Sequence, residues 1–361
     1  MIALRLRLEP RAAPSALLLL AVPALSSLAA LALALAILAL TGAPLGQAVP
    51  LLLSGAAGSL FAITETLTRA TPLIFTGLAA AATFRARLWN IGAEGQLYAG
   101  ALAAVAVGGG AVEAPAYVLV PLVMFAGASA GALLLIGPVL LKTRLAVDEV
   151  VTTLLLNFVA LLFVQMMLEG PMKDPMGLGW PQSVPILDNG VLPKLIAQMR
   201  LHAGLVLALI AAALIHWMQR YTALGLEMRA VGGNAAAARF AGISVPGTLI
   251  MTGLISGALA GLAGAGEVAG LKGYLTSDLS PGFGYAGIVV AMLAQLNALA
   301  VVPAAIFIAA VFVGADSMSR TLAVSNYFAD LVVALALMTT LAGSLFLRYR
   351  LRFVHRSKRR L

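Results

Sequence analysis

The sequence predicts an all-α, polytopic membrane protein: a bundle of about ten transmembrane helices, some of them short or broken. Hydrophobic residues make up 61% of the 361 residues and charged residues only 10%, whereas soluble proteins average about 45–50% and about 25%. The 36 glycines and 17 prolines lie inside apolar stretches, as is common in transmembrane helices. The chain has no cysteine, which excludes a disulfide-stapled secreted fold.

The transmembrane spans follow from the apolar runs, because a bilayer core needs about 20 apolar residues per helix. Residues 16–40 follow a basic lead-in, but this run is longer than the apolar core of about 7–15 residues in a cleaved signal peptide. We therefore expect a retained first transmembrane helix there. Further clear spans are 91–111, 117–141, 150–168, 202–219, 246–271 and 327–347.

Three stretches are less regular. Residues 59–84 form a continuous span only if Pro72 and two charged residues are tolerated, and Thr71-Pro72 is also a plausible start for a shorter helix. Residues 286–299 and 300–315 are short as well. Counting all of them gives ten crossings and places both termini on the same side. Short helices in both halves of a chain indicate a transport site between internal repeats.

Lysine and arginine are distributed unequally between the loops. With the N-terminal tail inside, the inside segments carry 17 basic residues and the outside segments five. The inside segments are 1–15, 85–87, 142–144, 219–245 and 348–361. The positive-inside rule therefore predicts cytoplasmic termini. The net charge of +9 reflects this pattern and a basic tail over 348–361 that would contact anionic lipid headgroups, so nucleic acid is not an expected partner.

A polar sequence interrupts the apolar pattern at Asn90-Ile91-Gly92-Ala93-Glu94-Gly95-Gln96. A carboxylate and two amides at membrane depth are costly and usually face a water-filled pathway or a protein partner. The two glycines allow a break in the helix. We expect Asn90, Glu94 and Gln96 to shape a substrate pathway; the alternative is a simple interfacial turn.

Other polar side chains lie inside predicted spans. Asn157 and Gln165, both within 150–168, are expected to face the protein interior, Asn157 toward the pathway. Glu267 either lines the outer half of the pathway or pairs with Lys272. Small residues recur every four positions and predict close helix packing. They are Gly253, Gly257 and Gly261 in one span and Gly127 and Gly131 in another.

The inside loop over 219–245 is the longest polar-leaning segment on its face. Asn234 is a suitable N-cap for an alanine-rich helix over Ala235–Ala241. Gly242 follows where a C-cap glycine would lie. This short helix has little to bury of its own, so we expect it to dock into a partner. The outside loop over 169–201 is either an ordered cap that could bind a partner or a plain connector.

Three sequence motifs carry a resemblance to a known family. They are NIGAEGQ at residues 90–96, GLEMRAVGGNAAAARFAGI at residues 225–243, and SGALAGLAGAGEVAGLKGYLTSDLSPGFGY at residues 256–285. Together they resemble the permease subunits of binding-protein-dependent ABC importers, in the branch that handles nucleosides and simple sugars. The similarity runs from about residue 60 to 347, and we take residues 1–361 as a single permease domain.

The resemblance implies partners and roles. It implies a separate ATPase subunit that binds ATP and Mg, a second permease chain, identical or homologous, and an extracytoplasmic substrate-binding lipoprotein, all at the bacterial inner membrane. The 219–245 loop would be the coupling helix that contacts the ATPase. We assign coupling to Gly225, Glu227, Arg229, Gly232, Asn234, Ala237 and Gly242.

The chain has no G-x-x-x-x-G-K-[ST] phosphate loop, so we expect no enzymatic activity and no cofactor in this subunit. A nucleoside is the expected substrate. A simple sugar or a ribityl-bearing molecule such as riboflavin is the alternative within this class. A proton-coupled carrier using Glu94 and Glu267 is a second class, but it leaves the docking loop unexplained. A membrane-embedded enzyme is disfavoured, because no acid/base or metal cluster is visible.

Overall fold

The computed structural model describes residues 4–11, 15–39, 45–323 and 325–355. Its contacts divide the chain into two compact units. The first combines Met1–Leu52 with Ala315–Leu361, and the second is Leu53–Gly314. Helices α2 (Leu45–Ala57) and α12 (Ala298–Thr321) each contribute to both units.

The first unit is built on two long helices, α1 (Ala16–Ala39) and α13 (Asn326–Arg348), which pack against each other. Their contact is close at Gly343, where an added Cβ would lie 2.1 Å from the Ser26 hydroxyl oxygen. A larger residue at this position would force the Ser26 side chain to move, so glycine favours the close approach of the two helices.

A strand pair accompanies these helices and was not predicted. Strand β1 (Leu4–Pro10) pairs antiparallel with β2 (Tyr349–His355), and Glu9 forms an ion pair with Arg350 at 2.9 Å. Both sequences alternate apolar and basic residues, which is the period of a strand. The basic tail predicted over 348–361 thus begins as a strand, and residues 356–361 lie outside the described residues.

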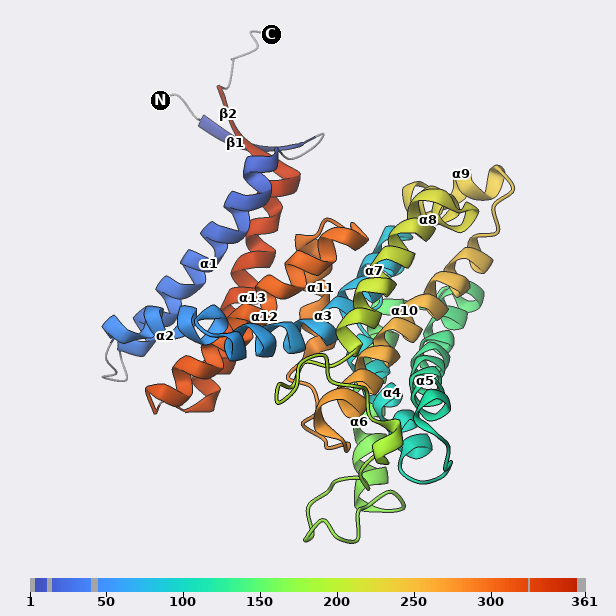
Figure 1. Ribbon diagram of the computed structural model, residues 1–361. Coiled ribbons are helices and arrows are strands. Elements are labelled where there is room, and N and C mark those ends of the chain that lie inside the picture. The colour runs from blue at the N-terminus through green and yellow to red at the C-terminus, as the bar shows by residue number, and fades with distance from the viewer. Residues whose placement is uncertain (1–3, 12–14, 40–44, 324, 356–361) are drawn as a thin grey trace. The chain divides into compact units, whose positions relative to one another are not determined.

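The second unit contains helices α3 to α11 (Figure 1). They are α3 (Leu60–Arg85), α4 (Ala93–Gly108), α5 (Ala116–Leu145), α6 (Glu149–Glu169), α7 (Gly204–Tyr221), α8 (Ala223–Gly233), α9 (Ala235–Phe240), α10 (Val245–Glu267) and α11 (Phe283–Leu293). A 3-10 turn (Asp188–Gly190) and a π-helix (Val268–Lys272) complete it. Helix α10 packs against α3, α4 and α5.

Glycines allow α10 to lie this close to its neighbours, as predicted. A Cβ added at Gly261 would lie 2.1 Å from the carbonyl oxygen of Gly127, and one at Gly131 would lie 2.2 Å from that of Gly257. No side chain fits at these distances, so backbones of α5 and α10 contact each other directly. The prediction that these glycines permit close helix packing is confirmed, and the structure adds that the two series pack against each other.

Helix α3 is continuous. It begins at Ser59, whose hydroxyl accepts a hydrogen bond from the Ala62 amide at 3.1 Å, and Pro72 lies inside the helix. The alternative start at Thr71 is therefore wrong. A stronger cap lies twelve residues upstream, and Thr71 donates its hydroxyl to the Leu67 carbonyl, as a helix-interior threonine does.

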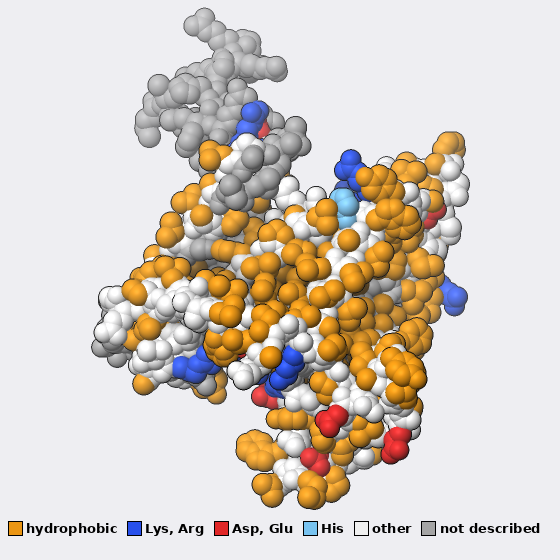
Figure 2. All heavy atoms as spheres, viewed as in Figure 1, with side chains coloured by type: hydrophobic (Ala, Val, Ile, Leu, Met, Phe, Trp, Pro, Cys, Tyr) orange, Lys and Arg blue, Asp and Glu red, His pale blue; other side chains and the backbone are white. Residues whose placement is uncertain are grey.

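The predicted count of ten spans is not confirmed. Within the described ranges, seven helices are long and apolar enough to cross a membrane, or eight if the bent pair Gly46–Ala57 and Leu60–Arg85 is one span. The ten included α4 and α11, which have 16 and 11 residues, whereas a full crossing needs about 20. Figure 2 agrees with a membrane protein, since hydrophobic side chains cover the sides of the helices on the face shown.

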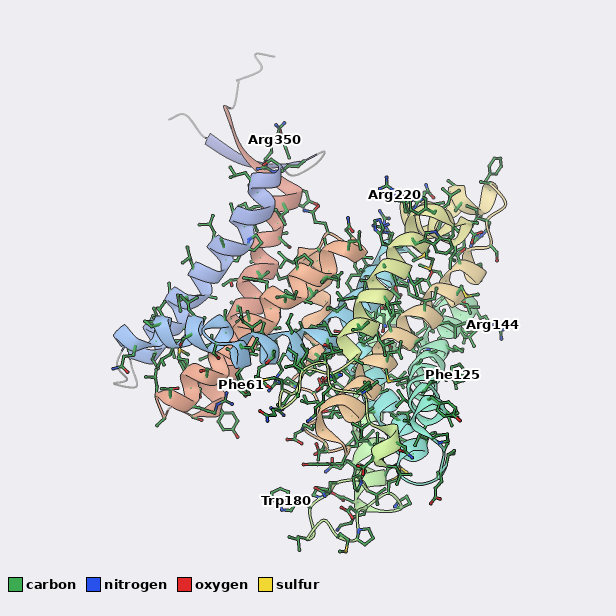
Figure 3. All side chains as sticks on the ribbon, viewed as in Figure 1. Phe61, Phe125, Arg144, Trp180, Arg220 and Arg350 are labelled. Carbon is green, nitrogen blue, oxygen red and sulfur yellow. The ribbon has the colours of Figure 1, made fainter. Side chains whose placement is uncertain are left out.

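Residues 169–201 form an ordered cap. Backbone amides of this segment donate to the stretch that follows α10: Ser183 to the Leu275 carbonyl at 3.0 Å, Ile186 to Gly273 at 2.7 Å, and Leu192 to Ala269 at 2.8 Å. Met176, Leu178 and Trp180 stand out from the cap with exposed side chains (Trp180 is labelled in Figure 3). The cap thus combines a fixed base with an apolar tip.

The membrane orientation remains a prediction, and the structure supplies two exposed reporters for it. Cysteines introduced at Ala236 in α9 and at Leu178 in the cap would be the only thiols of this cysteine-free chain. In intact cells an impermeant maleimide should label Leu178→Cys and leave Ala236→Cys unlabelled until the membrane is permeabilised. The opposite pattern would invert the predicted topology.

Candidate functional site

The polar sequence at residues 90–96 begins in a non-helical segment between two helices and runs into the second of them, inside the protein. Helix α3 ends at Arg85, and α4 begins only at Ala93. Arg87 adopts a positive φ of 54°, and the Leu88 amide bonds back to the Thr83 carbonyl at 3.0 Å. Because Ala86, Leu88, Asn90 and Gly92 are buried between the helices, their backbone groups need hydrogen-bond partners within the protein.

Asn90 and Gln96 form a reciprocal amide pair within this break. The Asn90 Nδ2 donates to Gln96 Oε1, and the Gln96 Nε2 donates to Asn90 Oδ1, both at 3.0 Å. Asn90 Nδ2 also reaches the Ser256 hydroxyl of α10 at 3.1 Å, and Ser256 donates to the Ala79 carbonyl of α3 at 2.9 Å. The pair therefore links α3, α4 and α10.

Asn157, on α6, holds the other side of the break. Its Oδ1 accepts the Gly95 amide at 2.8 Å, and its Nδ2 donates to the Ile91 carbonyl at 2.9 Å and to the Tyr285 hydroxyl at 3.1 Å. Thr153, one turn earlier, accepts the Ile91 amide at 3.1 Å. Gln165, expected to face inward as well, is exposed. Eight residues turn a helix about 80° past two full turns, which is enough to leave the buried face.

Glu94 contacts the start of α11. Its Oε2 accepts the backbone amide of Gly284 at 2.6 Å. A Cβ at Gly284 would lie 2.3 Å from the Glu94 amide nitrogen, so only glycine permits this approach. The Thr76 hydroxyl of α3 donates to the Phe283 carbonyl at 2.9 Å nearby. A carboxylate at a helix N-terminus is electrostatically favourable, and here it fixes the position of a short, broken helix.

Glu267 lies apart from this network, at the end of α10. The residue is 3% exposed, and Arg69, Arg200 and Lys272 are its charged neighbours. Lys272 forms its ion pair with Asp278 instead, at 3.7 Å. A hydrogen bond from Thr276, with a smaller contribution from Lys272, keeps the pKa of Asp278 below its usual value. The alternative that Lys272 is the ion-pair partner of Glu267 is therefore not supported.

The structure thus brings four of the five predicted pathway residues into one cluster, which we call the break cluster: Asn90, Glu94, Gln96 and Asn157. All four are buried and bonded to other parts of the chain. Sequence reasoning missed Thr153, Ser256 and Tyr285. Ser256 and Tyr285 are the first and last residues of the motif at 256–285. Their hydrogen-bond partners, Asn90 and Asn157, are more than 120 residues away in the sequence.

The coupling residues belong to two helices rather than one. Helix α8, which was not predicted, is held against the membrane domain: a Cβ at Gly232 would lie 2.0 Å from the Arg85 carbonyl oxygen, and one at Gly225 would lie 2.4 Å from that of Met218. Arg229 donates to the Gln219 carbonyl, and Glu227 accepts from Thr248 at 3.1 Å. These four positions therefore anchor the segment.

Helix α9 has the predicted caps. The Asn234 side chain accepts the amides of Ala236 and Ala237 at 3.0 and 3.1 Å, and Gly242 follows the helix with φ +85°. Ala237 faces outward, and Phe240 is 98% exposed. The helix therefore presents small residues and one large aromatic ring to the outside, while only its Ala238 is buried.

The sequence is similar to those of known proteins. Residues 62–342 match the family described as the permease component of branched-chain amino acid transport systems. The glucose ABC transporter permease TsgB13 of Haloferax volcanii is 37% identical over 96% of this chain and 93% of its own. The guanosine permease NupP of Bacillus subtilis is 35% identical over 92% and 94%. The nucleoside permease NupB of Lactococcus lactis is 32% identical over 73% and 75%. No solved structure matches the chain.

The break cluster predicts a stability effect. Replacing Asn157 with alanine leaves the buried Gly95 amide without a partner, which should cost about 1–3 kcal/mol of folding free energy. Gln165→Ala on the exposed face of the same helix is the matched control and should stay within about 0.5 kcal/mol of the parent. Thermal unfolding of the purified protein in detergent measures both. Equal losses in the two variants would contradict the structural role of Asn157.

Proposed function

We propose that this chain, which belongs to the permease family of branched-chain amino acid transport systems, is the translocating subunit of an ATP-driven nucleoside importer. The chain is an ABC permease of the sugar and nucleoside importer family and a multi-pass protein of the inner membrane. Family membership favours this function over a proton-coupled carrier.

The observation that carries the proposal is the form of the α8–α9 segment. Helix α8 is fixed by backbone contact at Gly232 and Gly225, while α9 exposes Ala237 and Phe240. A short capped helix with an exposed aromatic residue at its end is suited to insertion into a cleft of another chain. We assign that cleft to a separate ATPase subunit, which would bind ATP and Mg. This chain would itself need no cofactor.

The remaining partners are a second permease chain, identical or homologous, and a substrate-binding lipoprotein. The cap over 169–201 supports the second of these, because Met176, Leu178 and Trp180 form an exposed apolar tip on an ordered base. This tip lies on the side predicted to be extracytoplasmic, where a binding protein would deliver its substrate.

For the pathway, we propose that the break cluster acts by holding the short helix α11 and the start of α4 in position. Glu94 holds α11 by accepting the Gly284 amide, and Asn157 holds the start of α4 by accepting the Gly95 amide. Glu267, the last residue of α10, is proposed to border the pathway near Arg69 and Arg200. Substrate would pass beside these elements when the bundle opens.

A nucleoside is the proposed substrate because two of the relatives are named as guanosine and nucleoside permeases. A simple sugar is the second candidate, supported by the glucose permease of Haloferax volcanii. A riboflavin-type molecule has weaker support, from a probable riboflavin permease of Treponema pallidum that is 29% identical over 47% of the chain.

Coupling is tested by overfilling the proposed contact. In Ala237→Trp the new ring projects from the exposed face of α9, so the isolated permease should fold normally. Its fit to the ATPase should worsen by about 1–3 kcal/mol, and substrate-stimulated ATP hydrolysis and uptake should fall together. Ala116→Trp, at an exposed position of α5, is the control. Full transport by Ala237→Trp would show that α9 is not part of the contact with the ATPase.

The substrate is tested by purifying the complete importer with its binding protein and identifying the retained small molecule by mass spectrometry. We expect a nucleoside, released when ATP is added to the complex in lipid. A retained hexose would assign the chain to sugar import and leave the coupling proposal unchanged. Transport that needs no ATPase and stops when the proton gradient is dissipated would reject the importer altogether.

A further inference from the structure

A small polar cavity lies in the second unit where α3, α7 and α8 meet the turn before α12. Its volume is about 260 Å³, and it is lined by Arg85, His216, Gln219, Arg220, Arg229 and Asn297. Basic side chains gather at this end of the helices in the space-filling view, and Arg220 is labelled there in Figure 3. The lining therefore contains three arginines and no carboxylate.

In the part of the chain that the structure describes, none of the three guanidinium groups has a carboxylate partner. Among the described residues, no Asp or Glu lies within ion-pair distance of Arg85, Arg220 or Arg229. Arg85 donates to the Leu296 carbonyl at 3.0 Å, and Arg229 donates to the Gln219 carbonyl. Both bonds direct arginines to neutral acceptors, and the charges of Arg85 and Arg229 repel each other.

Gln219 provides an independent indication of a ligand. The residue is 2% exposed and lines the cavity, and its amide Nε2 has no hydrogen-bond partner in the described part of the chain. A buried donor without an acceptor costs about 1–3 kcal/mol. An acceptor bound in the cavity would satisfy this donor and reduce the arginine repulsion at the same time.

We propose that this cavity binds a phosphate group, either as the headgroup of an anionic phospholipid or as a free phosphate. Guanidinium groups match phosphate oxygens in geometry and charge, and the uncharged Gln219 amide adds a donor. Basic pockets between transmembrane helices on the cytoplasmic side are suited to lipid headgroups. The cavity volume of about 260 Å³ lies below the range of pockets that bind drug-sized ligands, about 300–1,000 Å³, and suits a small headgroup.

The site also includes the coupling segment. Arg229 belongs to α8, and the neighbouring Gly232 of α8 rests on the carbonyl oxygen of Arg85. A phosphate bound by Arg85 and Arg229 would bridge α3 and α8. Binding in this cavity does not depend on the proposed substrate or on the ATPase, so it can be tested on the purified full-length permease alone.

The first arm of the experiment titrates inorganic phosphate into the permease in a neutral detergent by calorimetry. The second measures retention of phosphatidylglycerol, against phosphatidylcholine, by native mass spectrometry of protein extracted from nanodiscs containing both lipids. Arg220→Gln should weaken binding of the preferred probe by about tenfold or more. Arg220 makes a ring contact to Tyr221 and is exposed, so the variant should fold.

Two further variants separate binding from folding. Gln219→Leu removes an unpartnered amide, so the melting temperature should hold or rise while phosphate affinity falls. Arg144→Gln, an exposed arginine at the end of α5 (Figure 3), should leave both unchanged. Phosphate binding in detergent assigns a free-phosphate site, and selective phosphatidylglycerol retention alone assigns a lipid site. Absence of both, or equal binding by Arg220→Gln and the parent, would overturn the proposal.

Discussion

The break between α3 and α4 imposes the strictest constraint on this protein. Within a membrane bundle every backbone amide and carbonyl must find a partner inside the protein, and residues 86–92 leave a helix without forming another. Side chains of α6 supply partners at two of these residues: the Glu149 carboxylate accepts the Trp89 amide at 3.2 Å, Thr153 accepts the Ile91 amide, and Asn157 donates to the Ile91 carbonyl. Polar residues in an otherwise apolar helix are thus explained by the break that they satisfy.

These side chains are short, so they can act only if the helices lie very close together. The glycines of α5 and α10 provide that closeness, with Gly127 against Gly261 and Gly131 against Gly257. The same holds between α4 and α10, where a Cβ on Gly264 would lie 1.9 Å from the Leu97 carbonyl oxygen. The close packing of α10 therefore accompanies the polar network, in which Ser256 of α10 bonds to Asn90.

Local features of the fold could be predicted from the sequence, and long-range ones could not. The cap of α9 at Asn234 and the glycine spacing of α10 depend on residues within a few positions of each other. Helix α8 was missed because the cluster into which it packs Met228 and Val231 is formed by residues of α3, α5 and α10 that are distant in the sequence. The count of ten spans is not confirmed, because hydropathy cannot distinguish a full crossing from a short helix such as α11, which is positioned by Glu94.

Helix α8 packs directly against the end of α3, where the break begins. Helix α8 rests on the carbonyl of Arg85, the last residue of α3, and the break begins at the next residue. On its other side, Glu227 of α8 accepts a hydrogen bond from Thr248 of α10, two turns before Ser256 joins α10 to Asn90. Packed interiors resist gradual deformation. A displacement of α8 would therefore reach α3 and α10, two of the helices that contact the break cluster, through contacts only a few residues long.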